Sequence, residues 1–183
     1  MHYNKSKAVS YARQWAGNGP KHEKHNPDYK FFEKSDCTNF VSQCLHAGGI
    51  PYTADWYFTN ILGFKKDSKV WGDVVSNFKY FRNPMYFSNG VIVVKKLSQI
   101  KTIISRVQPG DLLYWDYKAE PPIVDHATII SSTTNGKLKF CGHSSFRTDA
   151  VVDKTFFTSA VKCLRIVRMK TDMSLPASLV YGM

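Results

Sequence analysis

One cysteine of the chain stands where a thiol could carry out chemistry. The stretch SDCTNFVSQCLHAGG spans residues 35–49 and places Cys37 directly before an apolar stripe of helical spacing. Asp36 or Ser35 can cap this helix, and the glycines at 48–49 end it. Cys37 could be a nucleophile, a metal ligand, half of a disulfide or a small buried side chain. A position in the first turn favours the nucleophile, because unpaired backbone N–H groups there stabilise a thiolate.

The spacing of the four cysteines narrows these alternatives. Cys37 and Cys44 lie on one helix and are separated by roughly 10 Å, which is too far for a disulfide. A bridge from Cys37 to Cys141 or Cys163 stays open, but four cysteines in 183 residues are far from the density of a disulfide scaffold. The chain has no CxxC pair. We therefore expect free thiols, no metal and no cofactor.

Two histidines are candidate partners for the thiol. Asn135-Gly136 stands between two alternating apolar runs and is a strong hairpin signal. A turn at these two residues places Thr128 opposite His143. His126 then lies on the same face as His143, as a diagonal neighbour at roughly 7 Å. A shift of one residue in the register would put the two rings on opposite faces.

These three side chains suggest a cysteine hydrolase. In such a site Cys37 is the nucleophile, His126 is the base and then the acid, and His143 orients His126. Backbone N–H groups of the first helical turn would stabilise an oxyanion. The alternative is that each histidine is an ordinary packed or solvent-facing residue.

Four further residues are candidates for substrate contact, each with a structural alternative. Asp36 is a helix cap that could also tune the site. Asn39 could bond a neighbouring loop or touch the substrate. Trp56 and Trp71 could line a groove, because flat aromatic rings suit sugars and peptides, or they could pack in the core.

The hydrophobic pattern predicts the elements that must position these residues. Helical spacing predicts helices over 7–16, over the stretch that follows Cys37, and over 97–107, with a short one over 71–81. Residues 17–29 are rich in Gly, Pro, Asn and charge and predict a surface loop. Alternation predicts strands over 111–116, 123–133, 138–145 and 161–169. Helices followed by strands indicate an α+β fold, with an antiparallel sheet packed on the N-terminal helices, in a single domain of residues 1–183.

The charge of the chain favours an anionic partner. The 25 Lys and Arg against 14 Asp and Glu give a net charge of +11. The alternative is a basic surface that only aids solubility. The charges are scattered, without the tight basic block that nucleic-acid binding requires, so we expect no nucleic acid. No apolar run is long enough to span a membrane, and we expect a soluble monomer.

Several motifs resemble one bacterial family. DCTNFVSQCLHAGG, the upstream NPDYKFF, the downstream SKVW, and then QPGDLLYWD, DHATII and GHSS occur in the order seen in the bacterial putative amidase domain family. This family is grouped with the papain-like, NlpC-like and CHAP-type hydrolases. The resemblance runs from about Tyr11 to about Arg168, and DCTNFVSQ is its most specific part.

The resemblance implies a fold, a site and a substrate class. It implies a papain-like (NlpC-like) fold with Cys37 as nucleophile at a helix N-terminus, His126 as base and His143 as a third member whose type varies among relatives. It also implies a hydrolase of peptidoglycan that acts through an acyl-enzyme at the bacterial cell wall. N-acetylmuramoyl-L-alanine amidase is the leading interpretation. A stem or cross-bridge endopeptidase, a protein-directed cysteine peptidase of a toxin or effector, and a basic wall-binding module without activity stay open.

Action at the wall requires export. The first residues lack the basic and apolar regions of a secretory signal. A trimmed signal, excision from a larger protein and another export route are the alternatives that the sequence leaves open.

Overall fold

The first two helices carry the candidate nucleophile and its support. The computed structural model describes residues 1–19, 22–117, 124–157 and 161–180. Helix α1 spans Lys5–Trp15, and the side chain of Asn4 caps it by accepting from the Lys7 N–H. Helix α2 spans Cys37–Ala47 and ends at Gly48. Both helices bury an apolar face, which in α2 includes Phe40, Val41, Cys44 and Leu45.

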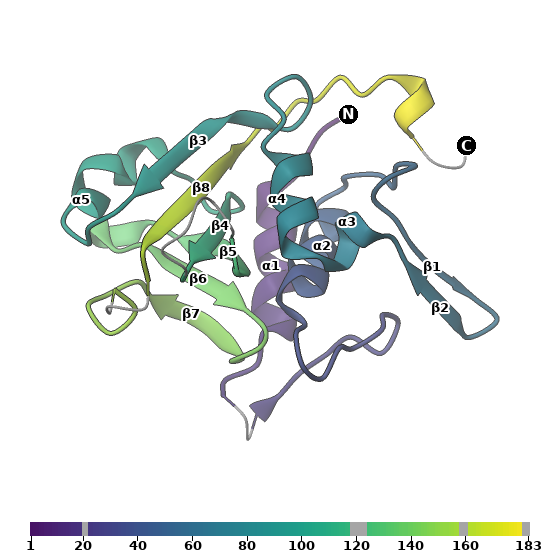
Figure 1. The fold of residues 1–183 in the computed structure, drawn as a ribbon, viewed down its shortest axis with the longest axis horizontal. Helices are drawn as coiled ribbons and strands as arrows, with labels where there is room; N and C mark the ends of the chain where they lie inside the picture. The colour runs from purple at the N-terminus through teal and green to yellow at the C-terminus, as the bar shows by residue number, and fades with distance from the viewer. Residues whose placement is uncertain (20–21, 118–123, 158–160, 181–183) are drawn as a thin grey trace.

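The segment between α2 and the main sheet holds a small hairpin and two short helices. Strands β1 (Phe58–Ile61) and β2 (Phe64–Asp67) pair antiparallel and extend away from the helices (Figure 1). Helices α3 (Lys69–Gly72) and α4 (Val74–Phe81) follow, and α3 packs against α2.

The main sheet has six strands, and every neighbouring pair is antiparallel. Its strand order is β3-β8-β4-β5-β6-β7. Helix α5 (Gln99–Ile103) continues into a 3₁₀ turn, Ile104–Arg106, between β3 and β4. Two more 3₁₀ turns span Thr134–Gly136 and Ala177–Leu179. The strands span Ser88–Val94 (β3), Leu112–Asp116 (β4), His126–Ser132 (β5), Lys139–Gly142 (β6), Arg147–Val151 (β7) and Cys163–Met169 (β8).

The sheet separates two apolar cores. On one face, Leu112, Tyr114 and Ala127 pack with buried side chains of helices α1 to α4. On the other face, Leu113 and Trp115 pack with α5 and with the segments that flank it. All five residues of β4 are buried, because the strand is covered on both faces. Among the described residues, no helix combines the length and the apolarity needed to cross a membrane.

Most of the predicted elements are confirmed, and the α+β class is confirmed with them. Four strands were not predicted: β1 and β2 of the hairpin, and the edge strands β3 and β7 of the main sheet. The predicted strand start at 123 lies outside the described residues.

The predicted register of the β5–β6 hairpin was wrong by one residue. Asn135 and Gly136 form the turn with φ of 56° and 68°, as expected for this pair. Ser132 pairs with Lys139 as predicted, but the register shifts between Ile130 and Ser132, and Ile130 pairs with Phe140. A β-bulge of this kind inserts one extra residue into a strand. His143 therefore does not lie opposite Thr128, and the predicted arrangement of the two histidines on one face is lost.

Candidate active site

Cys37 is the first residue of α2. The prediction that it lies in the first turn of a helix is confirmed. Its side chain is 2% exposed. Its sulfur lies 3.7 Å from the hydroxyl of Thr38, and the imidazole of His126 and the backbone N–H of Ala127 are near enough to lower the pKa of the thiol. His126 begins β5, so a helix start and a strand start bring the two side chains together. The structure thus joins two of the three predicted catalytic residues.

The surroundings of Cys37 favour its thiolate. Burial raises the pKa of the thiol, because it removes water from the charged form. The hydrogen bond and the charge of His126 outweigh this effect, with further hydrogen bonds from Ala127 and Thr38. The net result is a pKa of about 7, below the ordinary value of 9.0. A substantial fraction of Cys37 is therefore a nucleophilic thiolate near neutral pH.

The pKa values of the other three cysteines are shifted in the opposite direction. All four cysteines are free, so none of the disulfides that stayed open from the sequence is formed. Burial raises the pKa of Cys44, of Cys141 and of Cys163. Among the four cysteines only Cys37 has a lowered pKa, and the largest lowering influence on it is His126.

Asp36 precedes the nucleophile but does not cap its helix. Its side chain makes no capping hydrogen bond, which contradicts the sequence-based interpretation. One carboxylate oxygen accepts from the Phe32 N–H at 3.0 Å and from the Asn39 amide at 2.7 Å, and the other faces His143 at 2.5 Å. The carboxylate is thereby turned away from the first-turn N–H groups of α2. Asp36 is 2% exposed, and its carboxylate is engaged by these three partners within the protein.

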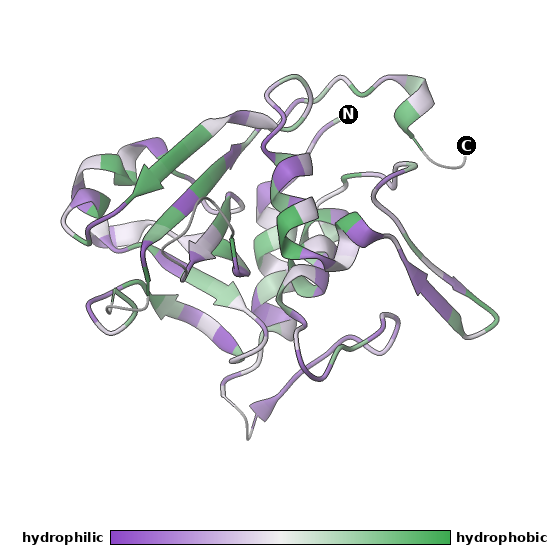
Figure 2. Cartoon of the chain, in the orientation of Figure 1, coloured by the Kyte–Doolittle hydropathy of each residue, from purple (hydrophilic) through white to green (hydrophobic). Residues whose placement is uncertain are grey.

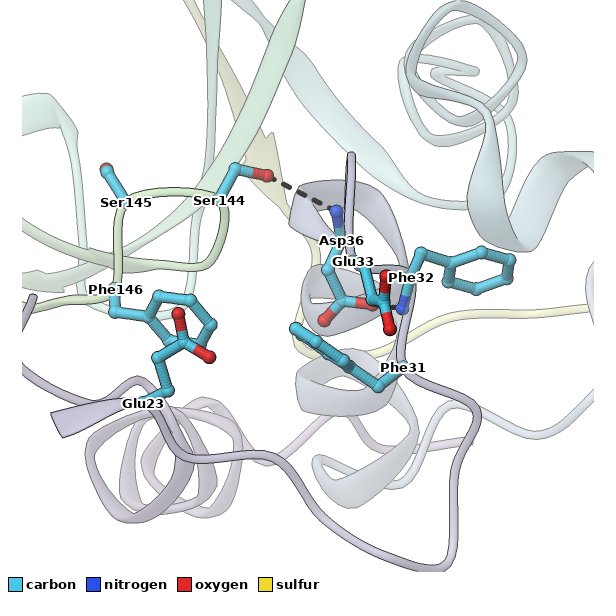
Figure 3. A pocket seen from close by; sticks show the side chains of 8 residues that line it. All are labelled: Glu23, Phe31, Phe32, Glu33, Asp36, Ser144, Ser145 and Phe146. Carbon is cyan, nitrogen blue, oxygen red and sulfur yellow. Dashed lines mark hydrogen bonds between the residues drawn. The ribbon is translucent and has the colours of Figure 1, made fainter. Parts of the chain in front are cut away.

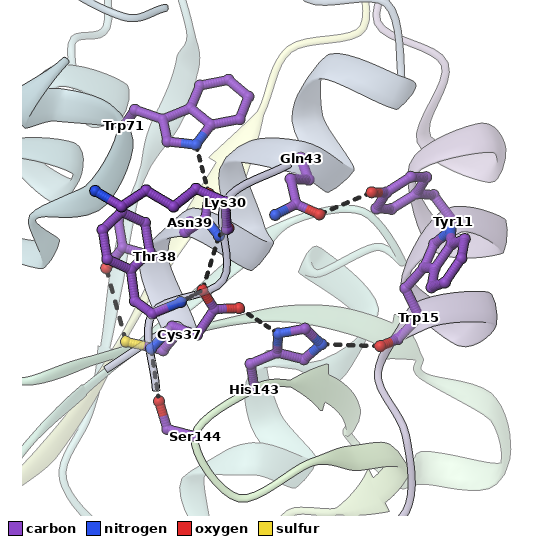
Figure 4. A network of polar contacts seen from close by, with 12 residues as sticks. Tyr11, Trp15, Lys30, Cys37, Thr38, Asn39, Gln43, Trp71, His143 and Ser144 are labelled. Carbon is purple, nitrogen blue, oxygen red and sulfur yellow. Dashed lines mark hydrogen bonds and ion pairs between the residues drawn. The ribbon is translucent and has the colours of Figure 1, made fainter. Parts of the chain in front are cut away.

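His143 lies in a different network from the one predicted for it. Its Nδ1 faces the carboxylate of Asp36, and its Nε2 donates to the carbonyl of Trp15 at 2.8 Å (Figure 4). Its ring stacks on Phe40 of α2 with a centroid distance of 4.0 Å. Both ring nitrogens are occupied by these partners, which leaves neither to orient His126. His143 instead joins α1, α2 and the end of β6 through one buried ring.

Asn39 and the two tryptophans are buried supports of the same helix. Asn39 is 1% exposed, donates to the Lys30 carbonyl at 2.7 Å and accepts from the Trp71 indole at 2.7 Å. Trp56 and Trp71 are 0% exposed, and the Trp56 indole donates to Ser42 at 3.0 Å. None of these three side chains lines an open groove, so the structural alternative is the one that the structure supports for each.

Two residues near the nucleophile were not found from the sequence. Tyr117 directly follows β4, and its pKa is raised to about 12 by burial and then by the charges of Cys37 and Asp125. Its phenol is therefore neutral at pH 7 and can donate a hydrogen bond. Ser144 accepts from the Asp36 N–H at 3.2 Å. Tyr117 follows the DLLYWD stretch, and Ser144 belongs to GHSS. Each residue lies shortly after a strand, where functional side chains are common, and this position could have identified both as candidates.

A cavity of about 380 Å³ lies beside the start of α2. Figure 3 shows Asp36 and Ser144 on its wall, joined by their hydrogen bond. The exposed carboxylates of Glu23 and Glu33 also face this space. Its remaining lining residues are Phe31, Phe32, Ser145 and Phe146. Asp36, the residue directly before Cys37, is part of the cavity wall.

Metal ligands are not grouped in this part of the molecule. Over the described residues, no three side chains of His, Cys, Asp or Glu are placed to hold a metal ion.

Comparison with known proteins places the chain in a family. A family model described as "Putative amidase domain" matches residues 2–164, which include Cys37, His126 and His143. The chain belongs to the Putative amidase domain family. The matched range starts nine residues before Tyr11, where the resemblance seen in the sequence begins. It ends four residues before Arg168, where that resemblance ends. Membership of this family indicates a hydrolase of amide bonds.

The curated relatives carry no assigned activity. The chain is 30% identical over 163 residues to the uncharacterized protein YjcM of Bacillus subtilis (strain 168), covering 86% of the chain and 34% of the relative. It is 27% identical over 169 residues to the uncharacterized protein YhbB of the same organism, covering 87% of the chain and 48% of the relative. The chain thus spans between a third and a half of the length of these relatives. No solved structure matches it significantly.

Proposed function

We propose that the protein is a cysteine amidase that cleaves an amide bond of peptidoglycan, with Cys37 as nucleophile and His126 as general base and acid. The observation that carries the proposal is the contact between His126 and the Cys37 thiol at the start of α2, which brings the pKa of Cys37 to about 7. A nucleophilic helix start packed on an antiparallel sheet is also the arrangement of papain-like hydrolases, and we assign the chain to that fold.

The reaction proceeds in two steps. The Cys37 thiolate attacks the amide carbonyl and forms a tetrahedral intermediate, and the His126 imidazolium then protonates the departing amine. The product of this step is a thioester between the acyl group and Cys37. In the second step His126 removes a proton from water, the resulting hydroxide attacks the thioester, and the thiolate leaves. The products are a carboxylic acid and an amine, and the enzyme returns to its initial state.

The charge on the intermediate is stabilised by nearby hydrogen-bond donors. The Asp36 carboxylate does not cap α2, so first-turn N–H groups are available to an oxyanion. We infer that the neutral phenol of Tyr117 is a second donor; this inference rests only on the charge of Cys37, which contributes to raising the pKa of Tyr117. We infer that Asp36 and His143 contribute by fixing the helix start, because each of them contacts it from a buried position.

Peptidoglycan is supported as the substrate by the family and by charge. A net charge of +11 attracts the anionic polymers of a bacterial wall, and salt screens such attraction between exposed charges. We therefore place the protein at the cell wall. Wall binding should weaken as salt concentration rises, and equal binding at low and high salt would argue against this part of the proposal.

Mass spectrometry of fragments released from purified peptidoglycan tests the activity and names the bond. A new N-terminal L-alanine identifies an amidase that acts between muramic acid and the peptide. A terminus within the stem or cross-bridge identifies an endopeptidase. A wall that stays intact, together with cleavage of a protein or peptide substrate, would replace the proposal by a protein-directed peptidase. A wall that is bound and not cut by the wild type would leave a binding module.

A further inference from the structure

The β1–β2 hairpin carries apolar side chains at its exposed end. Ile61 is 67% exposed, Leu62 is 93% exposed and Phe64 is 81% exposed, and we call these three residues the hairpin tip. Leu62 and Gly63 form the turn with φ of 51° and 86°, which is the left-handed pair of a type I′ turn. Figure 2 shows the hydrophobic colour at this turn beside hydrophilic strands. Large apolar side chains gathered at one projecting point mark an interaction site.

One face of the hairpin is fastened to the body of the protein. The Asn60 amide donates to the Asp28 carbonyl at 3.3 Å. The Lys65 ammonium donates to the Tyr29 carbonyl at 3.0 Å and to the carbonyl of Pro27. Asn60 and Lys65 are cross-strand partners, so both point to this face. These bonds hold the hairpin in place and keep its end projected without any partner.

The other face combines apolar side chains with positive charge. Ile61 pairs with Phe64, and Thr59 pairs with Lys66, so these four side chains share the face opposite to Lys65. Lys66 is exposed and stands behind the apolar pair. An apolar end followed by an ammonium group complements a bilayer with anionic headgroups, where the apolar groups enter the acyl boundary and the cation stays at headgroup level.

The size and shape of the tip favour a lipid surface over a protein. A stable protein interface buries about 800 Å² on each partner. Three side chains offer at most roughly 200 Å² each, even at the value for an aromatic ring. The tip also projects from two strands, so it cannot enclose a partner. A fluid bilayer accepts a small projecting wedge, and the charge of +11 supplies long-range attraction to anionic lipid.

We propose that the hairpin tip inserts into the surface of a bilayer that contains anionic lipids, and that Lys66 contacts its headgroups. This binding is separate from the chemistry of Cys37 and would hold the protein beside a membrane while its site faces other material. It needs no membrane-spanning segment, since a few apolar side chains and a nearby cation give reversible surface binding.

Vesicle co-sedimentation tests this proposal with variants that keep the fold. Leu62→Asn creates the Asn-Gly pair that type I′ turns prefer, and Phe64→Thr replaces the aromatic ring by a β-branched residue that also favours strands. We expect the double variant to bind phosphatidylcholine vesicles containing phosphatidylglycerol at least about tenfold more weakly than the wild type. Lys66→Gln should weaken binding severalfold on these vesicles and have no effect on vesicles of phosphatidylcholine alone.

Matched controls separate binding by the hairpin tip from nonspecific hydrophobic and electrostatic binding. Met85→Ser removes another apolar side chain that is 68% exposed, and Lys137→Gln removes an exposed cation from the β5–β6 turn. Both should bind within about twofold of the wild type, as should Cys37→Ala. The proposal is overturned if the wild type does not bind the anionic vesicles, or if the tip variants bind as well as the controls. It is also overturned if light scattering finds a dimer that the tip variants lose, because the tip would then bind a second copy.

Discussion

Replacement of His126 should raise the pKa of Cys37 and suppress its reactivity at neutral pH. Burial is the largest influence on this thiol and raises its pKa, and His126 supplies the two largest opposing effects. In His126→Asn the thiol keeps its burial and loses the imidazole, so its pKa should return to 9.0 or higher. The change from about 7 to 9.0 corresponds to about 2.7 kcal/mol in favour of the protonated thiol.

The size of the effect on reactivity follows from two opposing factors. At pH 7 about half of the wild-type thiol is thiolate, and about 1% would be thiolate at a pKa of 9, a loss of about fiftyfold. A thiolate of higher pKa is intrinsically more nucleophilic, by roughly six- to tenfold for this change. The alkylation rate of Cys37 at pH 7 should therefore fall by about five- to eightfold, and by a larger factor at lower pH.

The assay is alkylation of Cys37 by iodoacetamide as a function of pH, followed by peptide mass spectrometry. The wild-type rate should rise with pH through a midpoint near 7, because the thiolate is the reacting form. Ultraviolet absorbance of the thiolate, taken as the difference from Cys37→Ser, gives the same midpoint without requiring access of a reagent. A midpoint that stays near 7 in His126→Asn would refute the assignment of His126 as the group that lowers this pKa.

The remaining predictions concern the supports of the site. His143→Leu should lower the free energy of unfolding in urea by about 3 kcal/mol, because it leaves the buried Asp36 carboxylate without its partner, and His143→Asn should recover part of this loss through its amide. Trp71→Phe should cost about 1 to 3 kcal/mol in the same assay, since the Asn39 carbonyl loses its donor, and an unchanged midpoint would count against that bond. Tyr117→Phe should lower kcat on peptidoglycan about a hundredfold with little change in unfolding; equal kcat values would remove Tyr117 from the mechanism.

Local patterns predicted the elements that carry the nucleophile and its base. The start of α2 followed from the apolar stripe behind Cys37 and from the glycines that end it, both of which act within a few residues. The central strands followed from alternating and β-branched residues. Strands β1 and β2 were missed because FTNI and FKKD are short and largely exposed, and their turn is Leu62-Gly63 rather than a strong turn pair.

The arrangement around His143 depended on contacts that no local pattern contains. The bulge near Ser131 shifts the register by one residue, and a regular alternation gives no sign of it. The ring of His143 then meets Asp36 and the Trp15 carbonyl, which come from segments more than 100 residues earlier. The absence of a side-chain cap on α2 has the same origin, because tertiary partners compete for the carboxylate that could have capped it.

Hydrolysis of purified peptidoglycan by matched variants tests the central claim most directly. The initial rate of amine release should be measured for the wild type, for Cys37→Ala and for His126→Asn, together with binding of each protein to the same wall preparation. We expect release by the wild type, loss of turnover by at least about a thousandfold in Cys37→Ala, and unchanged wall binding in all three proteins. Release by Cys37→Ala at the wild-type rate would contradict the central claim.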